Sequence, residues 1–145
     1  MKKIQIIERE LTSAELAREH AGFDENGLEN GNPQESSVRY TFVAMDGTDF
    51  IGCSSGLAYK NGDVYNGWFN LTDLYVEKPY RGQGLGATLL RKLEERIARI
   101  GVTKISTFTA GFEAPGFYKK QGYHVIYEQE DWYATGHSRI ALRKG

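Results

Sequence analysis

The fold of this chain is decided by the stretch Leu74-Tyr-Val-Glu-Lys-Pro-Tyr-Arg-Gly-Gln-Gly-Leu-Gly-Ala-Thr-Leu-Leu90. A β-rich run ends at Val76, a proline-containing turn follows, and Arg81-Gly-Gln-Gly-Leu-Gly86 opens a helix. Glycine lets the backbone adopt a positive φ and lets a ligand approach without meeting a Cβ atom. The start of a helix supplies unpaired N–H groups and the positive end of a dipole. The stretch therefore predicts a site for a phosphate-bearing cofactor.

The composition of the chain limits the classes of protein to which it can belong. Its 145 residues suffice for one domain over residues 1–145, and a net charge of −1 lacks the basic field of a nucleic-acid binder. No apolar run approaches the ~20 residues of a membrane-spanning helix, and the start of the chain lacks the apolar segment of a signal peptide. One cysteine, Cys53, excludes an internal disulfide and suits a reducing compartment. We expect a cytoplasmic protein that binds neither nucleic acid nor membrane.

The first part of the chain changes from a helical to a β pattern. Lys3–Glu8 reads as a short strand, and Leu11–His20 reads as a helix with Thr12 and Glu15 spaced as a capping box. The polar segment Asp24–Ser37 is predicted to be a mobile surface loop, either a plain connector or a lid over a substrate pocket. A meander of three antiparallel strands follows, with turns at Asp46-Gly47 and Asn61-Gly62: Val38–Ala44, Phe50–Tyr59 and Val64–Val76.

Beyond the glycine-rich stretch, helices and strands alternate. Leucine and isoleucine recur at helical spacing from Leu85 to Ile100, and Gly101 is placed to end that helix. The remaining predicted elements are a strand at Thr103–Thr109, a short helix at Pro115–Gln121 and strands at Tyr123–Glu128 and Ile140–Arg143. The predicted fold class is α/β of the mixed α+β kind, with one central, mostly antiparallel sheet of six to seven strands and flanking helices.

Two nucleotide-binding motifs fail to account for the glycine turn. A dinucleotide-binding fingerprint needs the strand to run straight into the first glycine and an acid about 20 residues further on. Here Glu77-Lys-Pro-Tyr-Arg81 intervenes, and the next strand carries no acid. A P-loop would need Gly-Lys-Ser/Thr, whereas the chain has Leu85-Gly86-Ala87. A nucleotide-binding regulatory domain is therefore disfavoured.

The turn instead resembles the signature of the GCN5-related N-acetyltransferase (GNAT) family, Arg/Gln-x-x-Gly-x-Gly/Ala. Arg81, Gly84 and Gly86 match that pattern. A second block, Ala114-Pro-Gly-Phe-Tyr-Lys-Lys-Gln-Gly-Tyr123, is similar to the family's Ala-x-x-Phe-Tyr-x-x-x-Gly-Phe/Tyr pattern. The predicted order of elements also fits the family's layout. One departure is Gly111, which stands where the family often has asparagine, so that one contact to the coenzyme is missing or comes from Thr109 or backbone.

The resemblance implies a single GNAT-like domain that binds acetyl-CoA (coenzyme A). It implies a sheet splayed between the strand ending at Val76 and the strand starting at Thr103, with the arm of the coenzyme in the splay. Arg81 to Gly86 would hold the pyrophosphate, and Arg81 would add a charge-assisted contact, unless it is simply a solvated arginine. The implied cofactor-binding residues are Leu74, Tyr75, Val76, Arg81, Gly82, Gln83, Gly84, Leu85, Gly86, Ala87, Thr88, Thr109, Phe117 and Tyr118.

The resemblance also implies catalytic residues. Tyr118 stands at the family's tyrosine position, and a phenol, which stays protonated at neutral pH, suits a general acid for the leaving thiolate. Its alternative is a core aromatic. Asp73 is the candidate general base, directly or through water, and its alternative is a structural acid. Cys53 as an acyl-enzyme nucleophile is disfavoured, because no histidine neighbours it in the sequence.

The acceptor region implied by the family is the Asp24–Ser37 segment and the final hairpin. Trp132, Tyr133 and His137 could hold an amine by cation–π contact, or could pack a hairpin or a dimer interface. Acidic residues in Glu25–Glu35 and Glu128–Asp131 would suit a cationic acceptor such as a polyamine or aminoglycoside. The histidines His20, His124 and His137 lack metal-ligand spacing, so no metal is expected.

The function that these patterns favour is acetyl-CoA-dependent transfer of an acetyl group to a primary amine of a small molecule or peptide, directly in a ternary complex. The alternative is a non-catalytic acyl-CoA-binding sensor of the same fold. Family members often dimerise, so a homodimer is left open. The identity of the acceptor and of the base is also left open.

Overall fold

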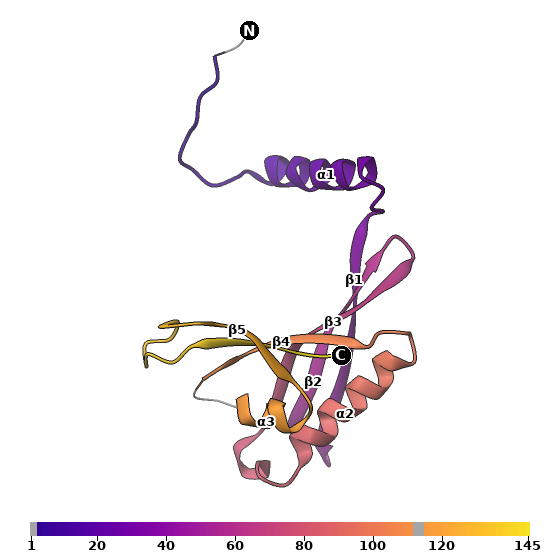
Figure 1. The fold of residues 1–145 in the computed structure, drawn as a ribbon, viewed down its shortest axis with the longest axis vertical. Helices are drawn as coiled ribbons and strands as arrows, with labels where there is room; N and C mark the ends of the chain where they lie inside the picture. Colours follow the sequence, from indigo (N-terminus) through magenta and orange to yellow (C-terminus); the bar gives the residue numbers. More distant parts are fainter. Residues whose placement is uncertain (1–2, 112–114) are drawn as a thin grey trace. The chain divides into compact units, whose positions relative to one another are not determined.

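The computed structural model describes residues 3–111 and 115–145. Its contacts divide the chain into two compact units, Met1–Glu35 and Ser36–Gly145, which are described separately below. Figure 1 traces both units along the chain. The expectation that residues 1–145 make one domain stays a prediction.

The first unit consists of an extended segment and one helix, α1 (Ser13–Glu29). The predicted capping box is confirmed, because the Thr12 side chain accepts from the Glu15 backbone N–H and the Glu15 carboxylate accepts from the Thr12 N–H. Bidentate contacts from Arg9 and the Thr12 N–H lower the pKa of Glu15 to about 2.

Two predictions for this unit are wrong. Lys3–Glu8 forms no strand, and Asp24–Ser37 is no single loop, because α1 continues to Glu29 and the first strand begins at Glu35. The helix continues past Gly27 and ends at Glu29, and its C-cap is Asn30, whose backbone N–H and side-chain amide both donate to the Asn26 carbonyl. A short connector remains between Asn30 and Glu35.

The second unit is built on one sheet of six strands in the order β1-β2-β3-β4-β6-β5. The strands are β1 (Glu35–Asp46), β2 (Asp49–Asn61), β3 (Val64–Val76), β4 (Lys104–Ala110), β5 (His124–Gln129) and β6 (Arg139–Lys144). The first three form the predicted meander, with two-residue turns after Asp46 and Asn61. The β3–β4 pair is parallel, and β6 lies antiparallel to both β4 and β5. The predicted mixed α+β sheet is confirmed, with six strands.

Helices cover one part of this sheet and enclose its core. The 3-10 turn η1 (Lys78–Tyr80) leads to α2 (Leu85–Ala98), and α3 (Pro115–Lys120) lies between β4 and β5 (Figure 1). The apolar side of α2 packs on the sheet, where the Ser54 hydroxyl donates to the Leu89 carbonyl at 2.9 Å. The core cluster contains Phe69, Leu71, Leu90, Leu93, Ile97, Ile105, Tyr118, Tyr123 and Leu142.

The sheet splays between β3 and β4, as predicted. Backbone pairing joins Trp68, Phe69 and Asn70 to Lys104, Ile105 and Ser106 and goes no further. At the next position the Thr107 hydroxyl donates to the Leu71 carbonyl at 3.0 Å, so a side chain replaces the backbone ladder. The second half of β3 therefore diverges from β4 as it approaches the glycine turn.

Among residues 3–111 and 115–145, no helix is long and apolar enough to cross a membrane. In the same residues no group of three or more His, Cys, Asp or Glu side chains is arranged to hold a metal ion.

Candidate active site

The glycine turn connects the end of β3 to the start of α2. Gly82 and Gly84 have φ of 77° and 83°, values that other residues adopt only with strain, so both positions require glycine. The Arg81 side chain donates from Nε to the Val76 carbonyl at 2.8 Å and thereby fixes the turn to the end of β3. Gly84 is the N-cap of α2, which leaves the first N–H groups of the helix without intrahelical partners.

A cavity of about 470 Å³ opens at this turn. It lies between the end of β3, the glycine turn, the first turn of α2 and one aromatic side chain of α3. The lining contains nine of the predicted cofactor-binding residues: Leu74, Val76, Arg81, Gly82, Gly84, Leu85, Gly86, Ala87 and Phe117. Leucine, valine and phenylalanine side chains provide an apolar wall, and the helix start provides the site for an anion.

The other predicted cofactor-binding residues lie outside this lining. The Tyr75 ring stacks on Phe50, and its hydroxyl donates to Glu77 at 2.9 Å. Gln83 is exposed in the turn, and the Thr88 hydroxyl donates to the Gly84 carbonyl inside α2. Thr109 is buried in the β4–β6 pair. Tyr118, described below, is the fifth predicted residue outside the lining. The cofactor roles of all fourteen residues stay predictions.

Two residues that the sequence patterns did not single out also line the cavity, Tyr80 and Gln121. Tyr80 directly precedes Arg81, and its hydroxyl donates to Asp46 at the β1–β2 turn. Its position inside the signature stretch was a usable signal. Gln121 directly follows α3 and lies inside the second motif block, at one of its variable positions, and the fold brings it to the cavity beside the glycine turn.

Tyr118, the predicted general acid, is buried on α3 with 6% of its surface exposed. Its ring packs edge-on against Phe117 and Tyr123, with centroids 5.4 Å apart in each pair. Phe117 lines the cavity, so Tyr118 is the next residue along the helix from the cavity wall. Ala114, the first residue of the second predicted motif, lies outside the described residues.

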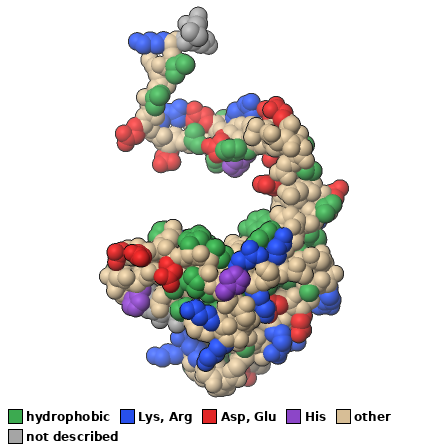
Figure 2. Space-filling model, viewed as in Figure 1, with side chains coloured by type: hydrophobic (Ala, Val, Ile, Leu, Met, Phe, Trp, Pro, Cys, Tyr) green, Lys and Arg blue, Asp and Glu red, His purple; other side chains and the backbone are tan. Residues whose placement is uncertain are grey.

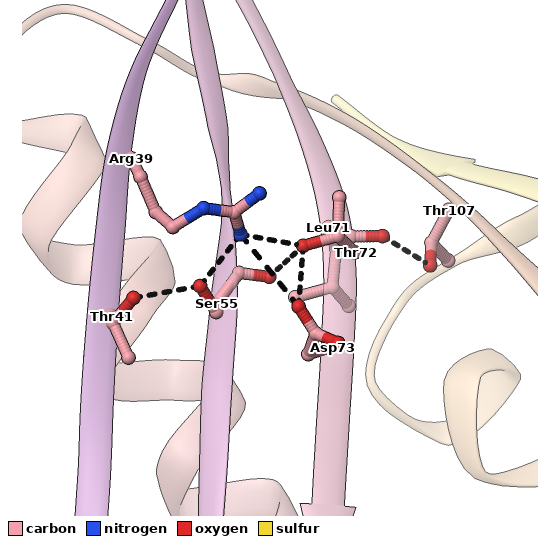
Figure 3. Close-up of polar contacts among 7 residues, drawn as sticks. All are labelled: Arg39, Thr41, Ser55, Leu71, Thr72, Asp73 and Thr107. Carbon is pink, nitrogen blue, oxygen red and sulfur yellow. Dashed lines mark hydrogen bonds and ion pairs between the residues drawn. The ribbon is translucent and has the colours of Figure 1, made fainter.

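Asp73, the predicted general base, lies on the diverging half of β3 (Figure 3). It pairs with Ser55 of β2, and its Oδ2 accepts from the Thr72 hydroxyl at 2.7 Å and lies 3.7 Å from Arg39 Nη1. More than half of its side chain is exposed, which leaves the carboxylate accessible to a substrate. Leu74 and Val76, on the same strand, line the cavity, so the carboxylate and the cavity share β3.

Cys53 lies on β2 opposite Tyr75 in the register. Burial, and to a smaller extent the negative charge of Asp73, raises the pKa of the thiol above its ordinary value. A thiol with a raised pKa is protonated at neutral pH and is a poor nucleophile. This environment argues against an acyl-enzyme at Cys53.

The predicted acceptor residues Trp132, Tyr133 and His137 lie in the turn between β5 and β6. The Tyr133 N–H donates to the His137 carbonyl at 3.2 Å, so these two residues close the turn together. The Arg139 guanidinium lies 5.1 Å from the Trp132 ring and 3.5 Å from the Phe108 ring. A cation from the chain itself therefore already packs on Trp132, which favours the hairpin-packing alternative. Figure 2 shows acidic side chains gathered at the outer end of this hairpin, where the sequence has Glu130 and Asp131.

The splayed sheet, the glycine turn and the partly apolar cavity together define an α+β protein whose cavity beside β3 has the chemistry to accept an elongated, anion-bearing ligand. Comparison with known proteins is in agreement. Residues 37–125 match the model of the family described as acetyltransferase (GNAT) domain, which covers more than half of the chain. The chain therefore belongs to the GNAT family of acetyltransferases, whose acetyl donor is acetyl-CoA.

The chain is similar in sequence and structure to several acetyltransferases. Blasticidin-S acetyltransferase of Streptomyces morookaense is 33% identical over 72 residues, which are 49% of this chain and 53% of that protein. The chain spans about half the length of the curated relatives that it matches. A crystal structure of an acetyltransferase from Bacillus cereus aligns with 97% of this chain and 96% of its own, at 23% identity and a TM-score of 0.78.

One further solved structure contains the donor. A GNAT family acetyltransferase from Elizabethkingia anophelis with acetyl-CoA bound is 15% identical, with a TM-score of 0.57 over 72% of this chain and 74% of that one. Likeness at this level of identity supports the fold.

Proposed function

We propose that the protein is an acetyl-CoA-dependent N-acetyltransferase that acetylates a primary amine of a small molecule or peptide, directly in a ternary complex. The observation that carries the proposal is the cavity at the glycine turn. Its lining combines the end of β3, the N-terminus of α2 and Phe117 of α3, which are the segments that bear both family motifs. Family membership and a structural relative with acetyl-CoA bound support the same donor.

In this proposal the pyrophosphate of the coenzyme binds the glycine turn and the start of α2. Gly82 and Gly84 hold the turn at positive φ, and a Cβ atom at either position would point into open space that a ligand can fill. Leu74 and Val76 contact the pantetheine arm where β3 diverges from β4. Arg81, anchored to the Val76 carbonyl through Nε, adds positive charge beside the pyrophosphate.

The chemistry requires two proton transfers. The amine nitrogen forms a bond to the thioester carbonyl carbon, and the C–S bond breaks. Tyr118 donates its phenolic proton to the departing sulfur, and Asp73, or a water molecule that it orders, takes the proton that the amine loses. The phenolate then regains a proton, so that the products are an amide and the free coenzyme thiol.

The acceptor is a primary amine whose identity the family leaves open. Acidic residues near Glu130 and Asp131 favour a cation, and Trp132, Tyr133 and His137 are the candidate acceptor residues on the final hairpin. The proposal also takes residues 1–145 as one acetyltransferase domain, located in the cytoplasm and able to form a homodimer. The B. cereus acetyltransferase, which aligns along nearly the whole chain, supports the single domain.

The proposal is tested by donor binding and by turnover. Acetyl-CoA should raise the melting temperature of the protein, whereas NAD and ATP should not; a ligand at 100-fold over its Kd stabilises by about 2.7 kcal/mol. A panel of amines, assayed by release of the coenzyme thiol, then finds the acceptor class. A shift with NAD or ATP instead of acetyl-CoA would contradict the proposed donor.

The variant Tyr118→Phe should lower kcat by about 100-fold and leave the acetyl-CoA affinity unchanged, because a general acid acts in the chemical step. Tyr123→Phe is the matched control. Tyr123 packs against Tyr118, and its hydroxyl donates to Glu94, so its loss should reduce stability by about 1 kcal/mol and leave kcat unchanged. Tight acetyl-CoA binding without acetylation of any amine would instead favour the non-catalytic sensor.

A further inference from the structure

Arg39 lies on the same face of the sheet as Asp73, and it is held there by one of its nitrogens. Nη1 donates to the Ser55 hydroxyl and to the Thr72 hydroxyl, each at 2.9 Å, and lies 3.7 Å from Asp73 Oδ2 (Figure 3). Alternation along β1 explains this orientation. Residues on either side of Arg39 are partly buried, whereas Arg39 itself points outward. Neither family motif includes this residue.

The hydroxyl groups around Arg39 are themselves fixed. Ser55 Oγ contacts Thr41 Oγ1 at 2.7 Å, and Thr72 Oγ1 lies 3.2 Å from the Ser55 carbonyl and 2.7 Å from Asp73 Oδ2. Thr72 can take part because it is the extra residue of a bulge: Ser55 pairs with Asp73 and Gly56 with Leu71. The bulge brings adjacent polar side chains of β3 to the same guanidinium. Nη1 therefore has a scaffold from three strands.

The opposite edge of the guanidinium is open. Among the described residues Nε and Nη2 of Arg39 meet no acceptor, and Figure 3 shows the second terminal nitrogen pointing away from the network. The side chain is 48% exposed. An arginine edge of two parallel N–H donors matches the two oxygens of a carboxylate. An arginine with a purely structural task would be expected to direct more of its five donors into the protein.

Asp73 presents a matching negative charge beside it. Its side chain is 57% exposed, and only Oδ2 takes part in the contacts to Thr72 and Arg39 in the described part of the chain. A positive and a negative group, both half exposed and less than 4 Å apart at their nearest atoms, suit a ligand that carries both charges. A polyamine would place a cation against Arg39, and a phosphate dianion would be repelled by Asp73 more strongly than a carboxylate.

We infer that Arg39 binds a carboxylate of the acceptor through its Nε–Nη2 edge, and that the acceptor is an amino acid or short peptide whose amine lies near Asp73. The inference rests on the proposed function, and it narrows the acceptor from amines in general to amines that also carry a carboxylate. It assigns to Arg39 a role in specificity, separate from the chemical step.

The test uses three probes that share the same diamine carbon chain and differ in the carboxylate. Lysine carries the carboxylate, lysinamide carries a neutral amide in its place, and cadaverine has neither group. The wild-type protein should acetylate lysine with a kcat/KM about 10- to 100-fold above that for the other two, the effect of a bidentate charge-assisted contact. In Arg39→Gln this preference should disappear, mainly through a higher KM for lysine. The acetyl-CoA affinity should not change.

Two further variants separate recognition from structure. Arg39→Lys keeps the charge and can still reach the hydroxyl scaffold but lacks the two-donor edge, so it should recover little of the preference. Arg91→Gln removes a positive charge from the exposed side of α2 and should keep the wild-type preference. An equal loss for all three probes in Arg39→Gln, or full recovery in Arg39→Lys, would overturn the inference.

Carboxylate binding by Arg39 can also be tested without acetyl transfer. If no amine is acetylated, calorimetric titration of lysine and cadaverine into the protein saturated with coenzyme A decides it. Binding of lysine but not cadaverine by the wild type, lost in Arg39→Gln, supports a carboxylate site without catalysis. Equal binding of both probes, or binding of neither, would overturn it.

Discussion

The two sides of β3 differ in how they are built. On one side, the cavity at the glycine turn comes mostly from a continuous segment, Leu74 to Ala87, and it offers backbone N–H groups, glycines and apolar walls. On the other side, the polar network takes Arg39 from β1, Ser55 from β2 and Asp73 from β3, and it offers charged side chains. A ligand on the first side is recognised by backbone and shape, and a ligand on the second by side chains.

The difference has a functional meaning under the proposed activity. A site that uses backbone groups tolerates changes of side chain, which suits a donor common to a whole family. A site made of a few side chains from separate strands changes its specificity with one substitution, which suits an acceptor that differs between members. We therefore expect substitutions on the two sides to affect different kinetic constants.

We call the side of β3 with the cavity the donor side and the side with the polar network the acceptor side. The largest effect on kinetics is expected on the acceptor side, for Asp73→Asn. Removing the proposed base should lower kcat by about 100-fold, with the acetyl-CoA affinity unchanged, and steady-state kinetics with a saturating amine would measure it. Glu77→Gln, at the first residue after β3, is the matched control and should keep kcat. A wild-type kcat in Asp73→Asn would assign the proton transfer to water alone.

On the donor side, Gly84→Ala should weaken acetyl-CoA binding by about tenfold, because a Cβ atom at φ 83° strains the turn and points into the cavity. Gly101→Ala is a matched control at the other end of α2, where φ is 80° and the Cβ position is equally open. Both variants should lose about 1 kcal/mol of stability. Calorimetry should find weaker acetyl-CoA binding in the Gly84 variant alone; equal affinities would separate the cavity from the donor.

The junction of the two sides is tested by Thr107→Val. This change keeps the shape of the side chain but removes the donor to the Leu71 carbonyl, so the free energy of unfolding should fall by about 1–3 kcal/mol. Urea denaturation measures the loss. Thr103→Val, at an exposed position just before β4, should change stability by less than about 0.5 kcal/mol. Equal losses would mean that the hydrogen bond at the splay contributes nothing.

The smallest effect concerns Cys53, whose thiol pKa depends in part on the charge of Asp73. Because burial and the Asp73 charge raise the pKa of the thiol, less thiolate is present at pH 8 than in a free cysteine. Alkylation by iodoacetamide, followed by mass spectrometry, should therefore be slower at pH 8 than alkylation of a free cysteine, and its pH profile should lie at higher pH. Asp73→Asn removes the smaller of the two causes and should shift this profile slightly toward lower pH. A rate that is already constant by pH 8 would contradict the raised pKa.

Local patterns were sufficient to predict the sheet and nine of the residues that line the cavity at the glycine turn. The turns after Asp46 and Asn61 and the strand Val64–Val76 depend on neighbouring residues, and the glycine turn is contiguous in the sequence. The helix α1 was predicted too short because Gly22, Asn26 and Gly27 favour turns when considered alone. In the structure the capping box at Thr12 and the ion pair of Arg18 with Glu25 accompany a helix that continues past them.

The acceptor side could not be predicted in the same way. Asp73 was found through its position on the strand before the glycine turn, but Arg39 and Ser55 lie 34 and 18 residues before it in the printed sequence. Their meeting depends on the register of β2 and β3 and on the bulge at Thr72, which leave no mark in local composition. Long-range pairing, rather than residue type, decides which polar groups share a site.

The three-pair contact between β3 and β4 has a mechanical consequence. The sheet has a seam that is closed at the Trp68–Asn70 end and open toward the glycine turn, and the Thr107 hydroxyl lies at the point where it opens. A ligand in the cavity would contact the end of β3 and, through Phe117, the helix α3 that follows β4 in the chain. Such a ligand should restrain the open part of the sheet. The amide groups of Leu71–Val76 should therefore exchange with solvent fastest when the cavity is empty.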